Sequence, residues 1–281
     1  MIQDIAPRQL QNPFYPHLPK NNDIVLNFCP TGILIKEGEQ LQFPTFEEYK
    51  NNTGNEKVVY LFSIGDTRFF MAEDQTEHQP EHTFAGYIFQ NMQQIRGYAE
   101  KANILAASTG WHLYHWYRNN QFCGRCGKPT VHDTKERMLR CTCGNLIYPK
   151  IAPAVIVAVV NGDSILLTRY ANRAYKKYAL IAGFTEIGET AEETVRREVM
   201  EECGLKVKKI RYYKSQPWGF DSNLLLGFFC EVDGDITITR DADELSEAQW
   251  VSREDVPDYK EGLSLTHEMM QVFRAGKEYT F

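Results

Sequence analysis

The chain has 281 residues, of which 43% are hydrophobic and 24% charged, a composition typical of an ordinary soluble protein. Its formal net charge of -6 argues against broad electrostatic capture of nucleic acid. The longest apolar run, residues 151–160, is too short to cross a bilayer, so we expect no membrane partner.

Cysteine usage indicates the redox compartment. Seven cysteines, an odd number, point to metal ligands and buried thiols rather than to a disulfide framework. The first residues contain no basic region leading into an apolar run, so we expect no signal peptide. We therefore expect a cytoplasmic protein.

The first part of the chain reads as strands followed by a helix. A turn at Gly65 and Asp66 joins the last two of the strand-like segments. A helix is predicted over residues 91–119, with Ile95 and Ala102 on one side. The strand-like segments are residues 23–28, 32–38, 57–62 and 67–73.

The last part of the chain has mixed α/β character. Residues 151–160 form an apolar, β-branched run that suits a buried strand. Asn161 and Gly162 are a strong hairpin turn, and residues 164–170 are predicted to return from it as a second strand. No internal repeat and no low-complexity linker separates these regions.

Four cysteines between the two parts have metal-ligand spacing. Cys123 and Cys126 form "CGRC", and Cys141 and Cys143 form "CTC", with fourteen residues between the two pairs. Two close pairs at this separation predict a zinc ribbon with a closed tetrahedral four-thiolate site, which is structural because it leaves no open position. The alternative is four unliganded thiols. The other cysteines are expected to be buried structural residues: Cys29, Cys203 and Cys230.

A helix is predicted over residues 191–203. Thr190 and Glu193 form a capping box at its start, and Gly204 supplies the C-terminal stop. Apolar residues recur every fourth position and define its buried stripe: Ala191, Val195, Val199 and Cys203.

The same helix carries Glu198, Glu201 and Glu202 on one face. On a helical wheel Glu198 and Glu202 overlap the apolar stripe, so carboxylates would crowd at the edge of a buried face. Mg²⁺ is held in proteins by a few carboxylates plus substrate phosphates, and it would relieve that repulsion. From charge alone, Arg197 is expected to pair with Glu189 or another carboxylate and to hold the preceding loop against the helix.

Residues 183–205 match the Nudix box, G-x5-E-x7-R-E-U-x-E-E-x-G-U with U apolar, at every fixed position. The chain therefore resembles the Nudix hydrolases. The resemblance implies an α/β/α sandwich around a mixed sheet and hydrolysis of a nucleoside diphosphate linked to another group. The matching residues are Gly183, Glu189, Arg197, Glu198, Val199, Glu201, Glu202, Gly204 and Leu205.

A zinc ribbon before a Nudix box, followed by "SQPWGFDSN" at residues 215–223, resembles the NADH pyrophosphatase subfamily. That resemblance implies an N-terminal β-rich α+β domain over residues 1–119, a ribbon over 120–149 and a Nudix domain over 150–281. It also implies a homodimer, one structural Zn²⁺ per chain, catalytic Mg²⁺ or Mn²⁺, and cleavage of NAD(H) to nicotinamide mononucleotide and AMP.

The resemblance assigns roles residue by residue. The metal ligands would be the Ala182 carbonyl, Glu198, Glu202 and Glu244, with Glu247 as the alternative to Glu244; Glu201 would be a further ligand or the general base. Phe184 would stack on the nicotinamide ring and Trp218 on a base. The expected substrate contacts are Arg96, Glu136, Tyr148, Phe184, Gln216, Pro217, Trp218, Gly219, Phe220, Asp221, Ser222, Asn223 and Thr266.

The chain departs from the subfamily pattern at two places. Its second cysteine pair is CxC instead of CxxC, which puts the zinc geometry in question. The subfamily has the tag S-Q-P-W-P-F-P-x-S where this chain has residues 215–223, so Gly219 and Asp221 replace two of its prolines. The replacement predicts a looser loop, a higher KM for NADH, and a lower KM when both prolines are restored.

Several functions remain open at this stage. The same chemistry can act on the NAD cap of an RNA, and the basic residues Lys206, Lys208, Lys209 and Arg211 leave room for that substrate. The domain can instead cleave ADP-ribose or a dinucleoside polyphosphate. A nucleotide-sensing zinc-ribbon regulator is the alternative from another class, although every Nudix-box carboxylate is retained.

Overall fold

The computed structural model describes residues 1–73, 84–171, 177–259 and 262–281. It divides into two compact units. Unit 1 comprises Met1, residues 151–217 and residues 223–281; unit 2 comprises residues 2–150 and 218–222. Among the described residues, no helix combines the length and apolar composition that crossing a membrane requires.

Unit 1 is built on a six-stranded mixed sheet. Its strand order is β14-β15-β11-β12-β16, and β13 pairs with β11. The β11–β15 pair is parallel, whereas β11–β12, β11–β13 and β12–β16 are antiparallel. The strands are β11 (Ala152–Asn161), β12 (Ser164–Tyr170), β13 (Ile181–Phe184), β14 (Val207–Trp218), β15 (Asn223–Val232) and β16 (Leu245–Ser252).

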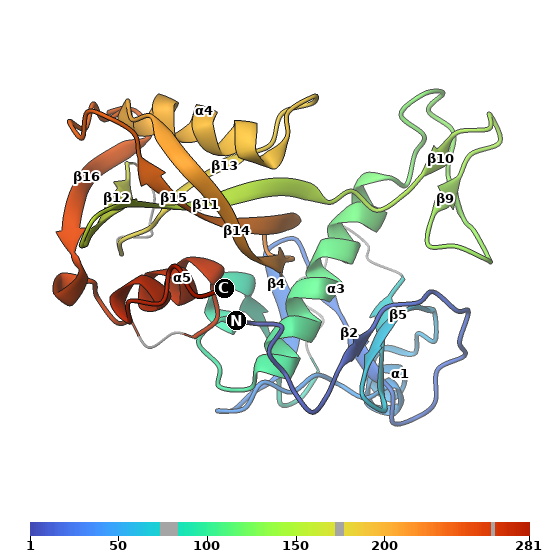
Figure 1. Ribbon diagram of the computed structural model, residues 1–281. Helices are drawn as coiled ribbons and strands as arrows, with labels where there is room; N and C mark the ends of the chain where they lie inside the picture. The colour runs from blue at the N-terminus through green and yellow to red at the C-terminus, as the bar shows by residue number, and fades with distance from the viewer. Residues whose placement is uncertain (74–83, 172–176, 260–261) are drawn as a thin grey trace. The chain divides into compact units, whose positions relative to one another are not determined.

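Helices α4 (Ala191–Cys203) and α5 (Leu265–Arg274) cover opposite faces of this sheet (Figure 1). A short 3-10 helix, η1 (Arg253–Asp255), follows β16. The core under α4 joins Val155 and Val157 of β11 to Val195 and Val199 of the helix. Residues 154–160 are buried without a break, as the apolar run predicted, because both faces of β11 are covered. The expected α/β/α sandwich is confirmed.

Unit 2 contains the β-rich N-terminal part and the ribbon. One sheet has the order β1-β5-β6-β2, a second β3-β4-β7, and a third, in the ribbon, β10-β9-β8. The strands are β1 (Leu10–Gln11), β2 (Ile24–Leu26), β3 (Phe28–Cys29), β4 (Gly32–Lys36), β5 (Val58–Ile64), β6 (Thr67–Ala72), β7 (Tyr87–Asn91), β8 (Val131–His132), β9 (Leu139–Arg140) and β10 (Leu146–Ile147).

The helices of unit 2 are α1 (Phe46–Thr53), α2 (Met92–Ile95) and α3 (Lys101–Asn119). The prediction of one helix over residues 91–119 is therefore wrong, because the chain leaves helical geometry between α2 and α3, around Gly97. The segment predicted as one strand over residues 23–28 is split between two sheets. Strands β4, β5 and β6 and the turn at Gly65 lie where they were predicted.

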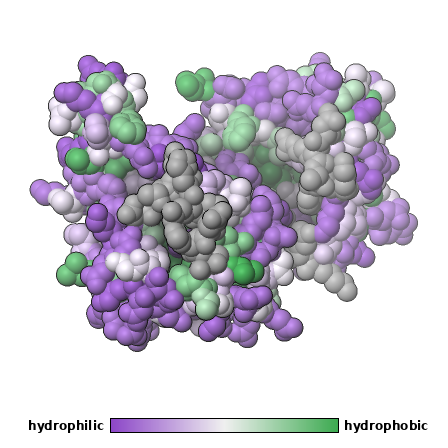
Figure 2. Space-filling model, turned by 180° about the vertical axis from the view of Figure 1, so that it is seen from behind, coloured by the Kyte–Doolittle hydropathy of each residue, from purple (hydrophilic) through white to green (hydrophobic). Residues whose placement is uncertain are grey.

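Figure 2 shows that the face turned away from the view of Figure 1 is mostly hydrophilic, with scattered apolar side chains. Large exposed apolar residues of the ribbon region include Phe122, Val131 and Tyr148. Isolated residues of this kind are normal on protein surfaces.

Candidate functional site

Helix α4 is fixed at both ends by local contacts. The Thr190 hydroxyl accepts the backbone N–H of Glu193 at 3.2 Å, and the Glu193 carboxylate accepts the backbone N–H of Thr190 at 2.8 Å. Gly204 ends the helix with a φ of 67° and donates its N–H to the Met200 carbonyl. The predicted capping box, helix limits and glycine stop are confirmed.

Two of the three glutamates of α4 are buried. Glu198 is 9% exposed and Glu202 2%, whereas the side chain of Glu201 is 59% exposed. The predicted overlap between the carboxylates and the apolar stripe is therefore confirmed for Glu198 and Glu202. Burial of an ionised carboxylate is costly unless charge or hydrogen bonds compensate it.

Arg197 gathers the carboxylates around one guanidinium group. It binds Glu189 through Nε at 2.6 Å and Nη2 at 2.9 Å, as charge pairing predicted. Its Nη1 reaches Glu198 at 2.7 Å and Glu201 at 2.9 Å, and its Nη2 also donates to the Phe184 carbonyl. These hydrogen bonds from Arg197 lower the pKa of Glu189 to about 2. One side chain thus ties the loop before α4 to the helix.

Gly183 in β13 gives the Glu198 carboxylate its place. A Cβ atom at position 183 would lie 1.9 Å from the carboxyl carbon of Glu198, so only glycine lets the carboxylate rest against this strand. The neighbouring Ala182 is the residue whose carbonyl was predicted to bind metal. Burial raises the pKa of Glu198, as do the charges of Glu201 and Glu244, while Arg197 opposes them.

A divalent cation fits this donor set. A buried carboxylate with further carboxylates close enough to disfavour its ionisation is stabilised by a hard cation with oxygen preference. Within the described parts of the chain, only the four cysteines bring three or more ligand atoms within 4.8 Å of one another, so the glutamates are not gathered as tightly.

Glu244 and Glu247 have different surroundings. Glu244 is exposed, and its negative charge helps to raise the pKa of Glu198. Glu247 is engaged elsewhere, because it pairs with Arg169 at 3.2 Å and accepts the Tyr178 hydroxyl at 3.2 Å. These surroundings are more consistent with Glu244 than with Glu247 as the predicted metal ligand from this segment.

The four cysteines of the ribbon fit zinc. Their sulfurs all lie within 4.8 Å of one another, with Cys123–Cys143 at 3.7 Å and Cys126–Cys141 at 3.4 Å. Tetrahedral zinc with Zn–S bonds of about 2.3 Å separates its sulfurs by roughly 3.8 Å. The shortened CxC pair is compatible with this geometry, because Gly144, with a φ of 87°, closes a turn onto the Cys141 carbonyl.

Two expected substrate residues of the ribbon region meet directly. The Tyr148 hydroxyl donates to the Glu136 carboxylate at 2.9 Å, and both side chains are exposed. In unit 2 the guanidinium of Arg96 lies 5.1 Å from the ring centre of Trp218. In unit 1, Phe184 is 55% exposed, which suits a ring that stacks on a ligand.

Two of the expected contacts are tightly packed. Gln216 is fully buried; its amide donates to the Leu263 carbonyl and accepts the Leu265 N–H, both at 2.7 Å, so it positions the start of α5, and its contact with substrate stays a prediction. Gly219 is not a loose link, because a Cβ there would lie 2.1 Å from the Ser108 carbonyl oxygen.

The remaining expected contacts differ in exposure. Phe220 is buried, Pro217 and Asp221 are exposed, and Ser222 has a φ of 60°. Half-buried residues of this set are Asn223 at the start of β15 and Thr266 in α5. Their contact with substrate stays a prediction.

Comparison with known proteins agrees with this geometry. The NUDIX domain model matches residues 150–271, and the NADH pyrophosphatase zinc ribbon domain model matches residues 118–148. The chain carries a NUDIX domain behind an NADH pyrophosphatase zinc ribbon. The NUDIX match contains Arg197 and the three carboxylates that it binds, Glu189, Glu198 and Glu201. The ribbon match contains the four cysteines.

Relatives named NAD-capped RNA hydrolase NudC occur in Salmonella typhi and Citrobacter koseri, 45% and 44% identical over 153 residues. Each alignment covers 54% of this chain and 59% of the relative, so the chain spans about three fifths of the curated relatives it matches. A NUDIX hydrolase structure from Nitrosomonas europaea has a TM-score of 0.48 and 21% identity, covering 54% of this chain and 90% of that one.

Three contacts were not predicted. Thr194 donates its hydroxyl to Glu189 at 2.9 Å, Asn145 donates to the Cys123 sulfur at 3.5 Å, and Asp221 accepts the indole N–H of Trp218 at 3.0 Å. The position of Asn145 two residues after the CxC pair was a usable signal, because amides near thiolates commonly donate to sulfur.

Proposed function

We propose that this protein hydrolyses the pyrophosphate bond of NAD(H) to nicotinamide mononucleotide and AMP with Mg²⁺ or Mn²⁺. The observation that carries the proposal is the buried Glu198 carboxylate, held between Gly183 and Arg197 in a NUDIX domain that follows an NADH pyrophosphatase zinc ribbon. The match of the ribbon to an NADH pyrophosphatase zinc ribbon model supports NAD(H) over the other nucleoside diphosphate derivatives.

In the proposed mechanism, the Ala182 carbonyl, Glu198, Glu202 and Glu244 would hold the cation, which would supply neutralisation of the pyrophosphate charge and a more acidic water. The oxygen of a water molecule forms a bond to one phosphorus while the bond from that phosphorus to the bridging oxygen breaks, and the bridging oxygen leaves on the phosphate of the other mononucleotide. Glu201 is exposed and would take the proton of the attacking water, while Arg197 holds the Glu198 and Glu201 carboxylates in place.

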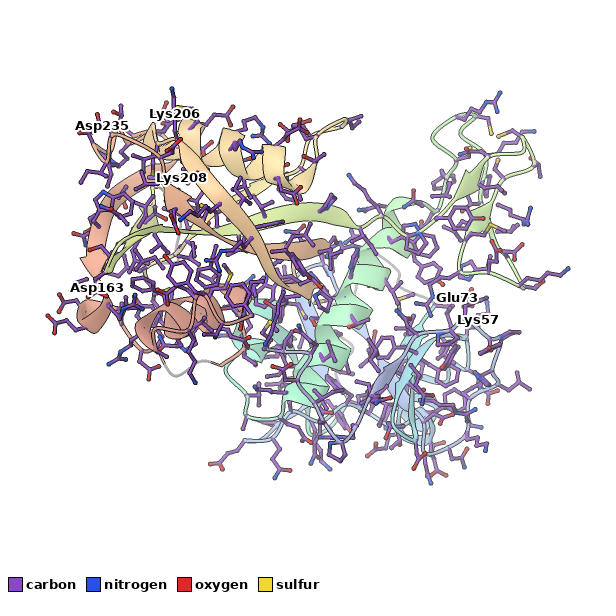
Figure 3. All side chains as sticks on the ribbon, in the orientation of Figure 1. Lys57, Glu73, Asp163, Lys206, Lys208 and Asp235 are labelled. Carbon is purple, nitrogen blue, oxygen red and sulfur yellow. The ribbon has the colours of Figure 1, made fainter. Side chains whose placement is uncertain are left out.

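Removal of NAD caps from RNA is the second candidate, supported by the name of the relatives, NAD-capped RNA hydrolase. The basic residues near β14 give it little help. Lys208 pairs with Asp233 at 3.0 Å and Lys209 with Glu231 at 2.9 Å, and Figure 3 shows Lys206 and Lys208 at the end of unit 1 where Asp235 also lies.

The proposal also includes a homodimer and a cytoplasmic location. All seven cysteines are free thiols, and a thiolate zinc site persists in a reducing compartment. Hydrogen bonds to the Cys123 sulfur, chiefly from the backbone N–H of Arg125, lower the pKa of this thiol to about 6 and so favour the thiolate. Light scattering of the purified protein measures the oligomeric state directly.

The test is a substrate panel with each metal. NADH, NAD⁺, ADP-ribose, a dinucleoside polyphosphate and NAD-capped RNA are incubated with Mg²⁺ or Mn²⁺, and products are identified by mass. We expect nicotinamide mononucleotide and AMP from NADH. Glu202→Gln, which removes a proposed cation ligand, should lose this activity. Glu192→Gln is its matched control and should keep it, because Glu192 is exposed in the first turn of α4. Absence of any NAD(H) cleavage by the wild type, with turnover of another panel member, would overturn the assignment.

A further inference from the structure

The segment from Trp218 to Ser222 belongs to unit 2, although its neighbours in sequence belong to unit 1. Gly219 lies against the backbone of α3, and a Cβ there would meet the carbonyl carbon of Ser108 at 2.6 Å as well as its oxygen. Ser108 itself is 2% exposed in the middle of α3. Backbone packs on backbone at this point, so proline and alanine are both excluded at position 219.

A tight turn follows this contact. The N–H of Asp221 donates to the Trp218 carbonyl at 3.3 Å, and the N–H of Ser222 donates to the Gly219 carbonyl at 3.4 Å. Ser222 has a φ of 60°, in the left-handed region that non-glycine residues enter only when their surroundings demand it. The buried Phe220 ring, 5.0 Å from the ring of Trp218, anchors the turn.

Within this turn, the Trp218 indole is held by two charged groups. Its Nε1–H donates to the Asp221 carboxylate at 3.0 Å, and the Arg96 guanidinium lies 5.1 Å from the ring centre. An indole N–H is a donor only, and a carboxylate is its strongest ordinary acceptor. A guanidinium over the face of an indole is attracted by the negative potential of the ring. The ring is therefore restrained both along its edge and on one face.

We propose that Asp221 is a positioning residue that fixes the orientation of the Trp218 indole. Proline in this tag would restrict the backbone. Asp221 instead restrains the Trp218 side chain by accepting its indole N–H, and Gly219 lets the turn lie against α3. Because Arg96 lies over one face of the ring, a planar base that stacks on the indole would use the other face. The consequence for substrate rests on the proposed function; the restraint on the indole does not.

The direct test is the indole N–H region of a ¹H–¹⁵N spectrum of the full-length protein. The chain has four tryptophans, and each resonance is assigned by a Trp→Phe variant. In Asp221→Ala the Trp218 indole proton should move upfield and exchange faster with solvent, because its acceptor is gone. In Asp221→Asn it should stay close to the wild-type position, because the amide oxygen still accepts. Trp250 is the internal control, since its indole donates to the Ile236 carbonyl.

Kinetics supply the second readout. Loss of a hydrogen bond worth about 0.5–1.5 kcal/mol should raise KM for NADH roughly two- to thirteenfold in Asp221→Ala, with kcat within about twofold. Asp221→Asn should retain most of the affinity. A Trp218 resonance unchanged in Asp221→Ala overturns the proposal, as does an equal shift in Asp221→Ala and Asp221→Asn. If the spectra behave as expected while wild-type protein does not cleave NADH, the proposed function fails and the positioning role stands.

Discussion

Substitution of Gly183 by alanine tests the placement of the Glu198 carboxylate. Gly183 does not have a positive φ, so its backbone accepts alanine without strain. The new Cβ would lie 1.9 Å from the carboxyl carbon of Glu198, and ordinary contact begins near 3.4 Å. The carboxyl carbon must therefore move by about 1.5 Å away from β13, and a shift of that size disrupts the 2.7 Å hydrogen bond from Arg197.

Activity and stability should respond very differently to this change. A displacement of about 1 Å at a reacting centre costs on the order of 100-fold in rate, so Gly183→Ala should lower kcat/KM by at least about 100-fold. Loss of the 2.7 Å hydrogen bond from Arg197 to a buried carboxylate removes about 1.5–3 kcal/mol of stability. The lower entropy of the unfolded alanine chain returns about 0.4–1 kcal/mol, which leaves a net loss of about 1–2 kcal/mol.

The assay compares NADH hydrolysis, Mn²⁺ binding by electron paramagnetic resonance, and thermal unfolding in wild type and Gly183→Ala. Gly124→Ala is the matched control, because Gly124 also lacks a positive φ and no atom lies within 4 Å of its added Cβ. Near wild-type turnover and Mn²⁺ affinity in Gly183→Ala would refute the reasoning, since the carboxylate would then tolerate displacement.

Glu202→Gln should reduce turnover by orders of magnitude with the circular dichroism spectrum unchanged, because it removes a charged ligand and keeps the shape. Elemental analysis should find about one zinc per chain, and Cys123→Ser should lower the unfolding temperature; a stable, zinc-free preparation would contradict the ribbon assignment. Glu189 has a folded-state pKa of about 2 against an ordinary 4.5, so its pairing stabilises the fold above about pH 4.5 and loses that effect as the pH falls toward 2; Arg197→Gln should remove this dependence in acid unfolding. Gly219→Pro should raise KM for NADH or destabilise the protein, opposite to the effect expected from the tag alone, and a lowered KM would show that α3 yields at this contact.

The features that the sequence predicted correctly depend on neighbours within a few residues. Helix α4 begins and ends where Thr190, Glu193 and Gly204 placed it, because a capping box and a left-handed glycine act within one turn. The pairing of Arg197 with Glu189 spans only eight residues and follows from opposite charges beside a helix start. Local physics was sufficient for this part of the candidate site.

The failures have two causes. Helix α1 has the same signals as α4, a capping box between Thr45 and Glu48 and a left-handed Gly54, but its weak apolar pattern, with Phe46 and Tyr49 as its buried residues, did not predict a helix. The burial of Gln216 and the packing of Gly219 depend on partners far away in sequence, at Leu263 and Ser108, which no local pattern reveals. Family patterns predicted a loose turn at Gly219 because they carry no information about the backbone opposite it.

The parallel pairing of β11 with β15 joins Ala152 to Asn223, and β13, the glycine-containing loop and α4 all lie in the chain between them. Parallel strands need a long connection, and its closure costs entropy before the contacts repay it, so such pairs form late in folding. The glutamates proposed to bind the cation thus lie inside the loop that this pair closes. The apolar residues of β11, which carry no polar side chain to the candidate site, therefore help to hold its geometry, and a cavity made at Val155 or Val157 should disturb the glutamates as well as the core.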